Sequence, residues 1–472
     1  MKALLQKISS FFSQYYKLDL RALALMRIAL ALVVMADLII RYSDLTVFYT
    51  NEGMWPLEML KHSGWKEGYW SVHALSGNSL LQICLIALQF LFAITLFFGF
   101  YSRTSAFLIY LLYISLHNRN IFILQAGDDL LRLSLLACSL LPIGARFALD
   151  TRKSTSVFIS SGANLFYLVL IASVYIFTVL LKTGADWRSD FTAVNYALQL
   201  RQLRMPLGEF LLKFPSLHAP FTILSLVLEL AIPILILWPS KSGKLRLYAF
   251  FCLLALHLAI GLTLYVGLFY LINICSALAL LPSSVMDNLS ARIKPALLME
   301  EPAISFSALT NSVGIILIFL CSFVNLSTIK SFDYEPGPPL AQIINAARLD
   351  QNWAMFSPGV LRKDGWLVLF GRDELGRQMD LRTHEDYVKF TEPESVSGMY
   401  KNDRWRKWAE NMQDERFTFL RPLFCEYILK NYNAHAKKQK AKTLHVYFMQ
   451  IDNSIDSTKT NPERKLYSFC HD

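Results

Sequence analysis

The chain has 472 residues, of which 54% are hydrophobic and 17% are charged, and its formal net charge is +10. Soluble domains carry about 25% charged residues, so the composition excludes an ordinary soluble protein and indicates membrane spans. The Lys and Arg residues are scattered between apolar runs without a basic–aromatic patch, which argues against nucleic-acid binding and favours a role in topology.

The first apolar run, Ala22–Ile40, follows a basic leader and has no small-x-small cleavage motif after it. We therefore expect an uncleaved helix rather than a signal peptide. Three of the later runs are short, which leaves burial in the bundle or a re-entrant path open: Thr104–Leu116, Leu130–Ile143 and Gly267–Leu281. The others are Leu80–Phe100, Ala163–Leu181, Phe221–Leu237, Tyr248–Tyr265 and Ala308–Leu326. The sequence thus predicts an all-α polytopic membrane bundle of about nine helices over residues 1–330.

Orientation follows from the basic residues in short loops. The loops that would be cytoplasmic contain Arg103, the Arg146–Lys153 cluster and Lys241–Arg246, so we expect a cytoplasmic N-terminus. Nine helices then place the C-terminal domain on the extracytoplasmic side. The loop from Lys182 to Pro220 is also basic but would face outward, so its charge needs an explanation other than topology. Three tryptophans in the first outward loop predict anchoring at the membrane interface: Trp55, Trp65 and Trp70.

Residues 331–472 have the composition of a water-soluble α+β domain. Trp366–Gly371 and Gln378–Leu381 flank a turn and predict a β-hairpin. Asp403–Asn431 has helical spacing, and Leu444–Ile451 alternates like a strand.

The cysteines do not suggest a metal site. Five of the seven lie in apolar runs, where a free thiol packs as a small hydrophobe, and no C-x-x-C motif indicates a zinc site or a redox dithiol. Cys425 and Cys470 lie in the C-terminal domain. In an extracytoplasmic compartment disulfides persist, so a bond and two free thiols both remain open.

Several ionisable residues lie in or beside the spans, where such side chains are costly and usually face the bundle interior. Each has a structural alternative. Arg27 can snorkel or bridge helices, Asp37 and Asp128 can lie at the interface, and His257 can be a hydrogen-bonded core residue. Glu229 precedes Pro233 by one turn and can interact with the backbone that this proline kinks. Asp129 and Arg132 lie one turn apart and can pair.

Lys182, where the fifth run ends, has two interpretations. At a helix end a lysine normally snorkels to water. At the edge of an apolar cavity it would instead lose solvation, and it could then act as a base near neutral pH. Asp186 is one turn away and could position the ammonium.

The segment Tyr175–Trp187 resembles the part of the vitamin K-dependent gamma-carboxylases that carries their catalytic lysine, and Lys182 falls on that lysine. The resemblance extends over most of the chain and is closest to the bacterial horizontally transferred transmembrane domain proteins. It rests further on His257 with Gly267–Phe269, Met26–Arg27 with Asp37, Phe48–Tyr49, His117–Asn120 with Gly127–Asp129, Trp353–Pro358 and Arg404–Trp408.

The resemblance implies a helical bundle with an extracytoplasmic α+β domain, and it implies chemistry. The carboxylases oxidise a reduced quinone, such as the reduced form of vitamin K, with oxygen, and the strong base so formed abstracts a glutamate γ-proton before carbon dioxide adds. Lys182 would deprotonate the hydroquinone, with His257, Glu229 and Arg27 shaping the pocket. The chain departs from the carboxylases at Asn120, where they have a histidine, because an amide cannot exchange protons as imidazole does.

The sequence leaves three hypotheses. The first is a carboxylase-like membrane enzyme that uses Lys182 as base on a quinone-like or other hydrophobic substrate; Asp186, Asp129 and Arg132 complete its candidate site residues. The second is a receptor, immunity or lipid-handling protein that keeps the fold without the chemistry. The third, a transporter, is the least favoured because no internal repeat is evident.

Overall fold

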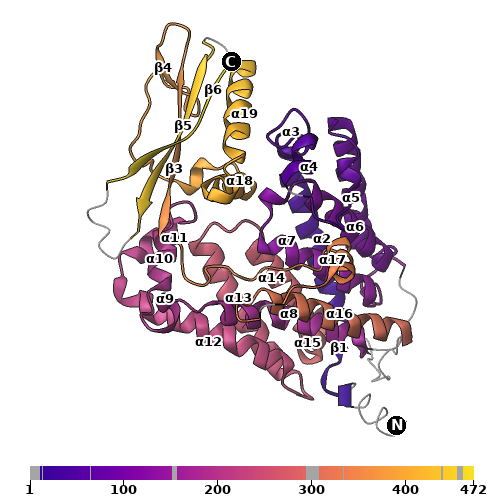
Figure 1. The fold of residues 1–472 in the computed structure, drawn as a ribbon. Coiled ribbons are helices and arrows are strands. Elements are labelled where there is room, and N and C mark those ends of the chain that lie inside the picture. The colour runs from indigo at the N-terminus through magenta and orange to yellow at the C-terminus, as the bar shows by residue number, and fades with distance from the viewer. Residues whose placement is uncertain are drawn as a thin grey trace.

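The computed structural model describes residues 11–12, 14–63, 65–150, 157–293, 308–332, 334–436, 439–453 and 461–472 (Figure 1). A helical bundle occupies most of the molecule, and the four-stranded sheet with α18 and α19 stands at one end of it (Figure 1). Within the described residues six helices are long and apolar enough to cross a membrane, which indicates an integral membrane protein. They are α2 (Leu20–Ser43), α5 (Ser79–Phe98), α8 (Gly162–Leu181), α12 (His218–Leu237, extended at its start by the turn η3, Pro215–Leu217), α13 (Lys244–Thr263) and α16 (Ala308–Ser327).

The three short apolar runs of the sequence form α6 (Ser102–Arg119), α7 (Ala126–Leu140) and α14 (Phe269–Ala277). After the turn η4 (Leu278–Leu280) the chain bends by 97° into α15 (Ser283–Ile293), and counting this bent pair as one span raises the number of described candidates to seven. The nine predicted helices also include α6 and α7, which are not among these candidate spans. Most residues of α7 are buried inside the bundle, as expected for a short apolar run.

Side-chain caps explain where several helices begin. The Asp19 carboxylate accepts the Arg21 N–H at the start of α2, and Asn78 caps α5 in the same way. Ser161 and Asn164 form a reciprocal capping box at the start of α8. α8 then packs between α12 and α16, while α2 packs on α5 and α6 on α7. The remaining elements before the C-terminal domain are β1 (Leu18–Asp19), paired with β2 (Phe158–Ile159), and the short helices α3 (Leu45–Tyr49), α4 (Leu57–Ser63), η1 (Val72–Ala74), η2 (Ile121–Ile123), α9 (Ala185–Arg188), α10 (Ala193–Gln199) and α11 (Pro206–Leu212).

The C-terminal domain begins with α17 (Pro338–Ala346) and contains an antiparallel sheet of order β4-β3-β5-β6. The predicted hairpin is confirmed as β3 (Lys363–Arg372) with β4 (Gln378–Asp380), and the predicted strand as β5 (Thr443–Asp452). The helical spacing over 403–431 is confirmed, in two helices, α18 (Asp403–Gln413) and α19 (Leu420–His435), which the turn η6 (Glu415–Phe417) separates. The strand β6 (Glu463–His471) was not predicted. Cys425 and Cys470 form a disulfide that ties α19 to β6.

Trp55 corrects the interpretation of the first loop. Its ring is fully buried and makes edge contacts with Phe122, which belongs to η2, and with Trp408 on α18. Trp55 therefore joins the bundle to the C-terminal domain instead of anchoring the loop in a membrane interface. The Trp70 indole N–H likewise donates to the Ala346 carbonyl oxygen at 2.7 Å.

Candidate functional site

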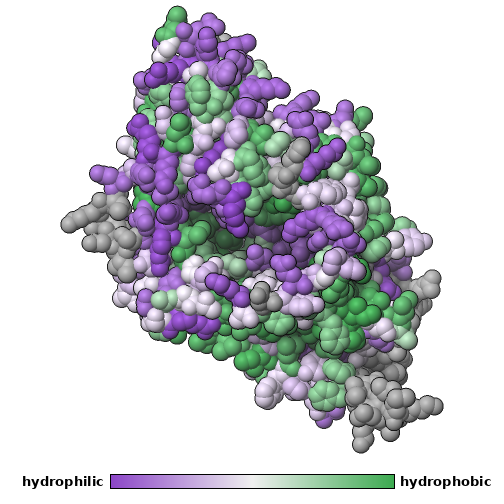
Figure 2. Space-filling model, in the orientation of Figure 1, coloured by the Kyte–Doolittle hydropathy of each residue, from purple (hydrophilic) through white to green (hydrophobic). Residues whose placement is uncertain are grey.

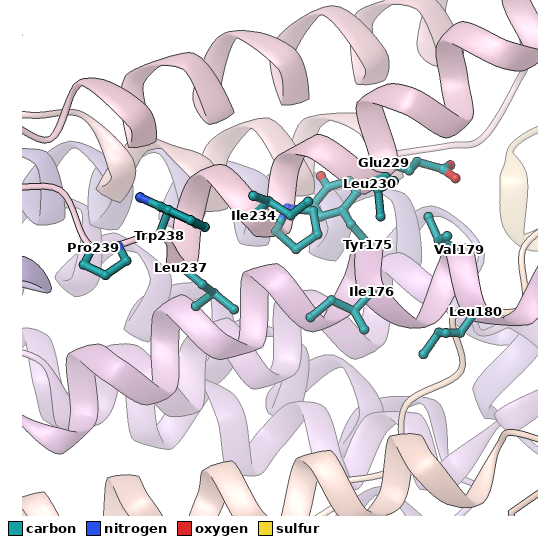
Figure 3. Close-up of a pocket in the computed structure, with 11 residues that line it drawn as sticks. Tyr175, Ile176, Val179, Leu180, Glu229, Leu230, Ile234, Leu237, Trp238 and Pro239 are labelled. Atoms are coloured by element: carbon teal, nitrogen blue, oxygen red, sulfur yellow. The ribbon is translucent and has the colours of Figure 1, made fainter.

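An apolar groove of about 520 Å³ lies between α8 and α12. Its side chains come from the second half of each helix, with Glu229 near one end and Trp238 and Pro239 at the other (Figure 3). Leu230 and Ile234 are more than half exposed on its rim. Glu229 is the sole ionisable carboxylate among these lining residues, so one end of an otherwise apolar groove carries a charge. The lining is Tyr175, Ile176, Val179, Leu180, Glu229, Leu230, Pro233, Ile234, Leu237, Trp238 and Pro239.

Lys182 caps the C-terminus of α8 and binds Glu229. Its ammonium lies 2.6 and 2.8 Å from the two carboxylate oxygens of Glu229. It also lies 3.9 Å from the centre of the Trp187 ring, a cation–π contact. The Lys182 residue is only 3% exposed, so it does not snorkel into water. The structure thus places a desolvated lysine and a carboxylate at the polar end of the groove.

Asp186 does not hold this lysine, contrary to the expectation from its spacing. Its Oδ2 atom accepts the backbone N–H of Val360 at 2.7 Å, and the Arg362 guanidinium lies 3.7 Å away. The backbone N–H of Gly184 donates to the Pro358 carbonyl oxygen beside it. The turn after Lys182 therefore anchors the segment that leads into β3, and Glu229 takes the positioning role that we expected of Asp186.

His257 on α13 reaches the groove through Tyr175. The Tyr175 hydroxyl lies 2.8 Å from His257 Nε2, and Tyr175 lines the groove. The imidazole also makes an edge contact with the Phe269 ring. Nδ1 of His257 has no hydrogen-bond partner among the residues that the structure describes. Of the predicted residues, Glu229 lines the groove itself. Lys182 and His257 lie behind the lining, where they contact Glu229 and Tyr175 respectively.

A second buried cluster lies where the C-terminal domain meets the bundle. Arg404 on α18 donates to both oxygens of Asp128 at 2.5 and 2.8 Å, and to Asp37 at 2.7 Å. Arg41 on α2 donates to the same two carboxylates at 2.7 and 2.6 Å. All four residues are at least 95% buried. Two guanidinium groups thus balance two carboxylates in a closed network.

The charge of Arg404 follows from this network. Burial lowers the pKa of its guanidinium, as does the neighbouring Arg41, but Asp128 and Asp37 raise that pKa above the usual arginine value. Arg404 therefore remains charged at neutral pH.

The network continues through His117 to Arg132. His117 Nδ1 lies 3.1 Å from Arg132, and its Nε2 atom lies 3.5 Å from Arg41. Arg132 pairs with Asp129 at 3.0 Å, as their spacing predicted. It also donates to the carbonyl oxygens of residues 348 and 350, each at 2.9 Å. The Asp129–Arg132 pair thus holds the chain that follows α17. Neither residue lines the groove.

We expected Arg27 to shape the groove, but neither Arg27 nor Asn120 lines it. Arg27 donates to the carbonyl oxygens of Ile143 and Phe147, which follow α7. Asn120 accepts the Phe122 N–H at 3.1 Å and donates to the Phe48 carbonyl at 3.0 Å. Both therefore stabilise turns between helices.

A hollow of about 290 Å³ lies beside the Arg404 network. Asp37, Arg404 and Tyr265 contribute to its lining, and Gly261 lines it one turn after His257 on α13. The molecular surface is hollowed among the positions of α2, α14 and α18 (Figure 2). His257 thus contacts Tyr175 of the groove, while the next turn of its helix borders a more polar hollow.

Among the residues that the structure describes, no group of three or more His, Cys, Asp or Glu side chains could hold a metal ion. Comparisons with protein-family models, with characterised proteins and with solved structures found no match to this chain.

Proposed function

We propose that the protein is a multi-pass membrane enzyme, similar to the vitamin K-dependent gamma-carboxylases, that removes a proton from a quinone-like or other hydrophobic substrate. The observation that carries this proposal is the groove, because Glu229, which lines one end of it, is paired with the buried Lys182. Its apolar walls suit a lipid-soluble compound, and exposed rim residues such as Leu230 would face the bilayer.

The ion pair accounts for how a charged lysine can act as base. Transfer of one proton from the Lys182 ammonium to the Glu229 carboxylate gives a neutral amine and a neutral acid. This step changes no net charge, so a buried apolar site favours it more than water does. The free amine then accepts the hydroxyl proton of a bound hydroquinone and returns to the ammonium form, leaving a quinol anion. With the His257 ring proton on Nε2, the Tyr175 hydroxyl would accept from His257 and keep its own proton for a hydrogen bond to that anion.

The carboxylation step itself is not part of the proposal. By the resemblance Asn120 stands where the carboxylases have a histidine, and both ends of its amide are occupied by backbone groups. This observation favours a second candidate, a membrane protein that binds a lipid-soluble compound without transforming it. Both candidate functions use the groove. They differ in whether Lys182 removes a proton from the bound compound.

We further propose that all nine helices cross the membrane, with the N-terminus in the cytoplasm and residues beyond 331 outside it. The basic loops support this orientation. The disulfide between Cys425 and Cys470 supports it as well, because disulfides persist in oxidising compartments.

Mass spectrometry of hydrophobic compounds that co-purify with the protein in mild detergent tests the proposal. Leu230→Trp fills the groove, whereas Leu224→Trp adds the same bulk on α12 outside the groove; the two leucines are 55% and 49% exposed. We expect a quinone-like compound with the wild type and Leu224→Trp, and its loss with Leu230→Trp. Equal retention by both variants, or no bound compound in the wild type, would contradict the proposal.

A further inference from the structure

Arg119, the last residue of α6, is a fully buried arginine without a counter-ion among the described residues. Its Nε, Nη1 and Nη2 atoms all lack a hydrogen-bond partner there. An arginine side chain keeps its positive charge at neutral pH. A buried charge without a partner is costly, so this guanidinium favours an anion beside it.

A second set of contacts points to an anion at the same place. The Ser115 hydroxyl, one turn before Arg119 on α6, lies 2.6 Å from Nδ1 of His73 and accepts the His73 backbone N–H at 3.0 Å. The same hydroxyl also lies 3.2 Å from the Ser71 hydroxyl. In the tautomer in which Ser115 donates to Nδ1, the ring proton lies on Nε2. Burial, followed by the Arg119 guanidinium, lowers the pKa of His73 to about 3, so the ring is neutral. Its Nε2–H is a buried donor with no partner in the described chain.

Among the described residues the unpartnered donors are thus the guanidinium and, in this tautomer, the imidazole N–H. The amide oxygen of Gln82, whose Nε2 donates to the His73 carbonyl at 2.8 Å, is an acceptor that also lacks a partner there. It can accept a hydrogen bond, but it carries no charge and so cannot neutralise the guanidinium. Because the surrounding side chains are buried, the site suits a small ion rather than an organic ligand.

We propose that Arg119 and the Nε2–H of His73 bind one small monovalent anion of the chloride class between α6 and the turn at η1. Water alone would satisfy the hydrogen bonds but would leave the guanidinium charge uncompensated. The anion would fasten the first outward loop, which contains η1, to the end of α6. This inference is independent of the groove and of any reaction there.

Halide dependence of stability tests the site in the full-length protein. At constant ionic strength, replacing sodium gluconate by sodium chloride should raise the thermal unfolding midpoint of the wild type in proportion to the logarithm of chloride concentration. Arg119→Gln should abolish this dependence. Arg103→Gln, a change on the same helix at a side chain that donates to the Ser139 carbonyl, should retain it. His73→Phe removes one donor to an anion and should raise the half-saturating chloride concentration about tenfold or more.

Crystals grown in bromide give a measurement that does not depend on the variants. An anomalous peak between Arg119 and His73 is expected, and it would support the site even if Arg119→Gln failed to fold. A wild-type midpoint that is equal in chloride and gluconate would overturn the proposal. So would bromide peaks that lie elsewhere only, since either result would mean that water fills the site.

Discussion

Arg404 of the C-terminal domain binds both carboxylate oxygens of Asp128 at the start of α7, 276 residues earlier in the chain. The same guanidinium reaches Asp37 on α2, so one side chain of the domain closes a contact between two helices of the bundle. The domain is therefore fixed to the bundle by a buried charge network as well as by the aromatic contacts of Trp55.

Arg404→Met tests this attachment. It leaves two buried carboxylates with Arg41 as their only strong counter-ion, and we expect a loss of about 3–5 kcal/mol in the free energy of unfolding. Combining it with Asp128→Asn should cost less than the single change, because fewer unpaired charges remain. Denaturant unfolding followed by tryptophan fluorescence measures both. The control is Arg416→Met, whose side chain is 79% exposed, and surface changes of this kind stay within about 0.5 kcal/mol. If the losses in unfolding free energy of the two single variants add up in the double variant, the charges of the network do not depend on one another.

Variants of Lys182 separate a catalytic from a structural role. Lys182→Arg keeps a cation beside Glu229 but cannot release a proton, because arginine stays protonated. It should preserve the unfolding midpoint and abolish conversion of the co-purifying compound. Lys182→Met strands Glu229 and should cost about 3–5 kcal/mol, much of which Lys182→Met with Glu229→Leu should restore. A fully active Lys182→Arg protein would refute the role of base and leave the binding function standing.

Reduction of the disulfide should weaken the C-terminal domain. The bond closes a sequence separation of 45 residues, and the loop-entropy relation assigns about 4 kcal/mol to a loop of that length. Cys470→Ser should lower the unfolding midpoint and remove its sensitivity to dithiothreitol. Cys84→Ser changes an exposed free cysteine and should leave both properties as in the wild type. If the wild-type midpoint is insensitive to reductant, the bond does not stabilise the domain.

Alkaline phosphatase and green fluorescent protein, which are active on opposite sides of the cytoplasmic membrane, can report the topology. Fusion after Lys153 should give fluorescence, since the Arg146–Lys153 cluster is basic and such loops stay inside. Fusion after Asp472 should give phosphatase activity. If both fusion points lie on the same side of the membrane, the number of spans between them is even. That result would exclude the nine-helix arrangement.

The sequence predicted the apolar helices and the β3–β4 hairpin because both have strong local signals, hydrophobic length and a turn between alternating strands. It missed β6, whose side chains are mostly exposed or half-buried and so give no clear alternation. The division between α18 and α19 arises at Asp414, which caps the turn η6. That cap is a single aspartate, and within a helical spacing pattern its signal is weak.

The site was predictable in its components and not in its pairings. Lys182, Glu229 and His257 were candidates because each is ionisable beside an apolar run. The partner of Lys182 comes from α12, and no local spacing relates it to α8, whereas Asp186 was favoured because it is near in sequence. Arg41 had a usable signal, since it follows Asp37 by one helical turn. Arg404 had none, because its partners lie hundreds of residues away.

The late position of Arg404 in the chain has a consequence for biosynthesis. While the ribosome is still making the C-terminal domain, Asp37 and Asp128 have already entered the bundle and share Arg41 as their close cation. The nascent bundle therefore carries one excess negative charge in its interior until α18 emerges and docks. We therefore expect a chain that ends before Arg404 to keep this uncompensated carboxylate and to be less stable than the full-length protein.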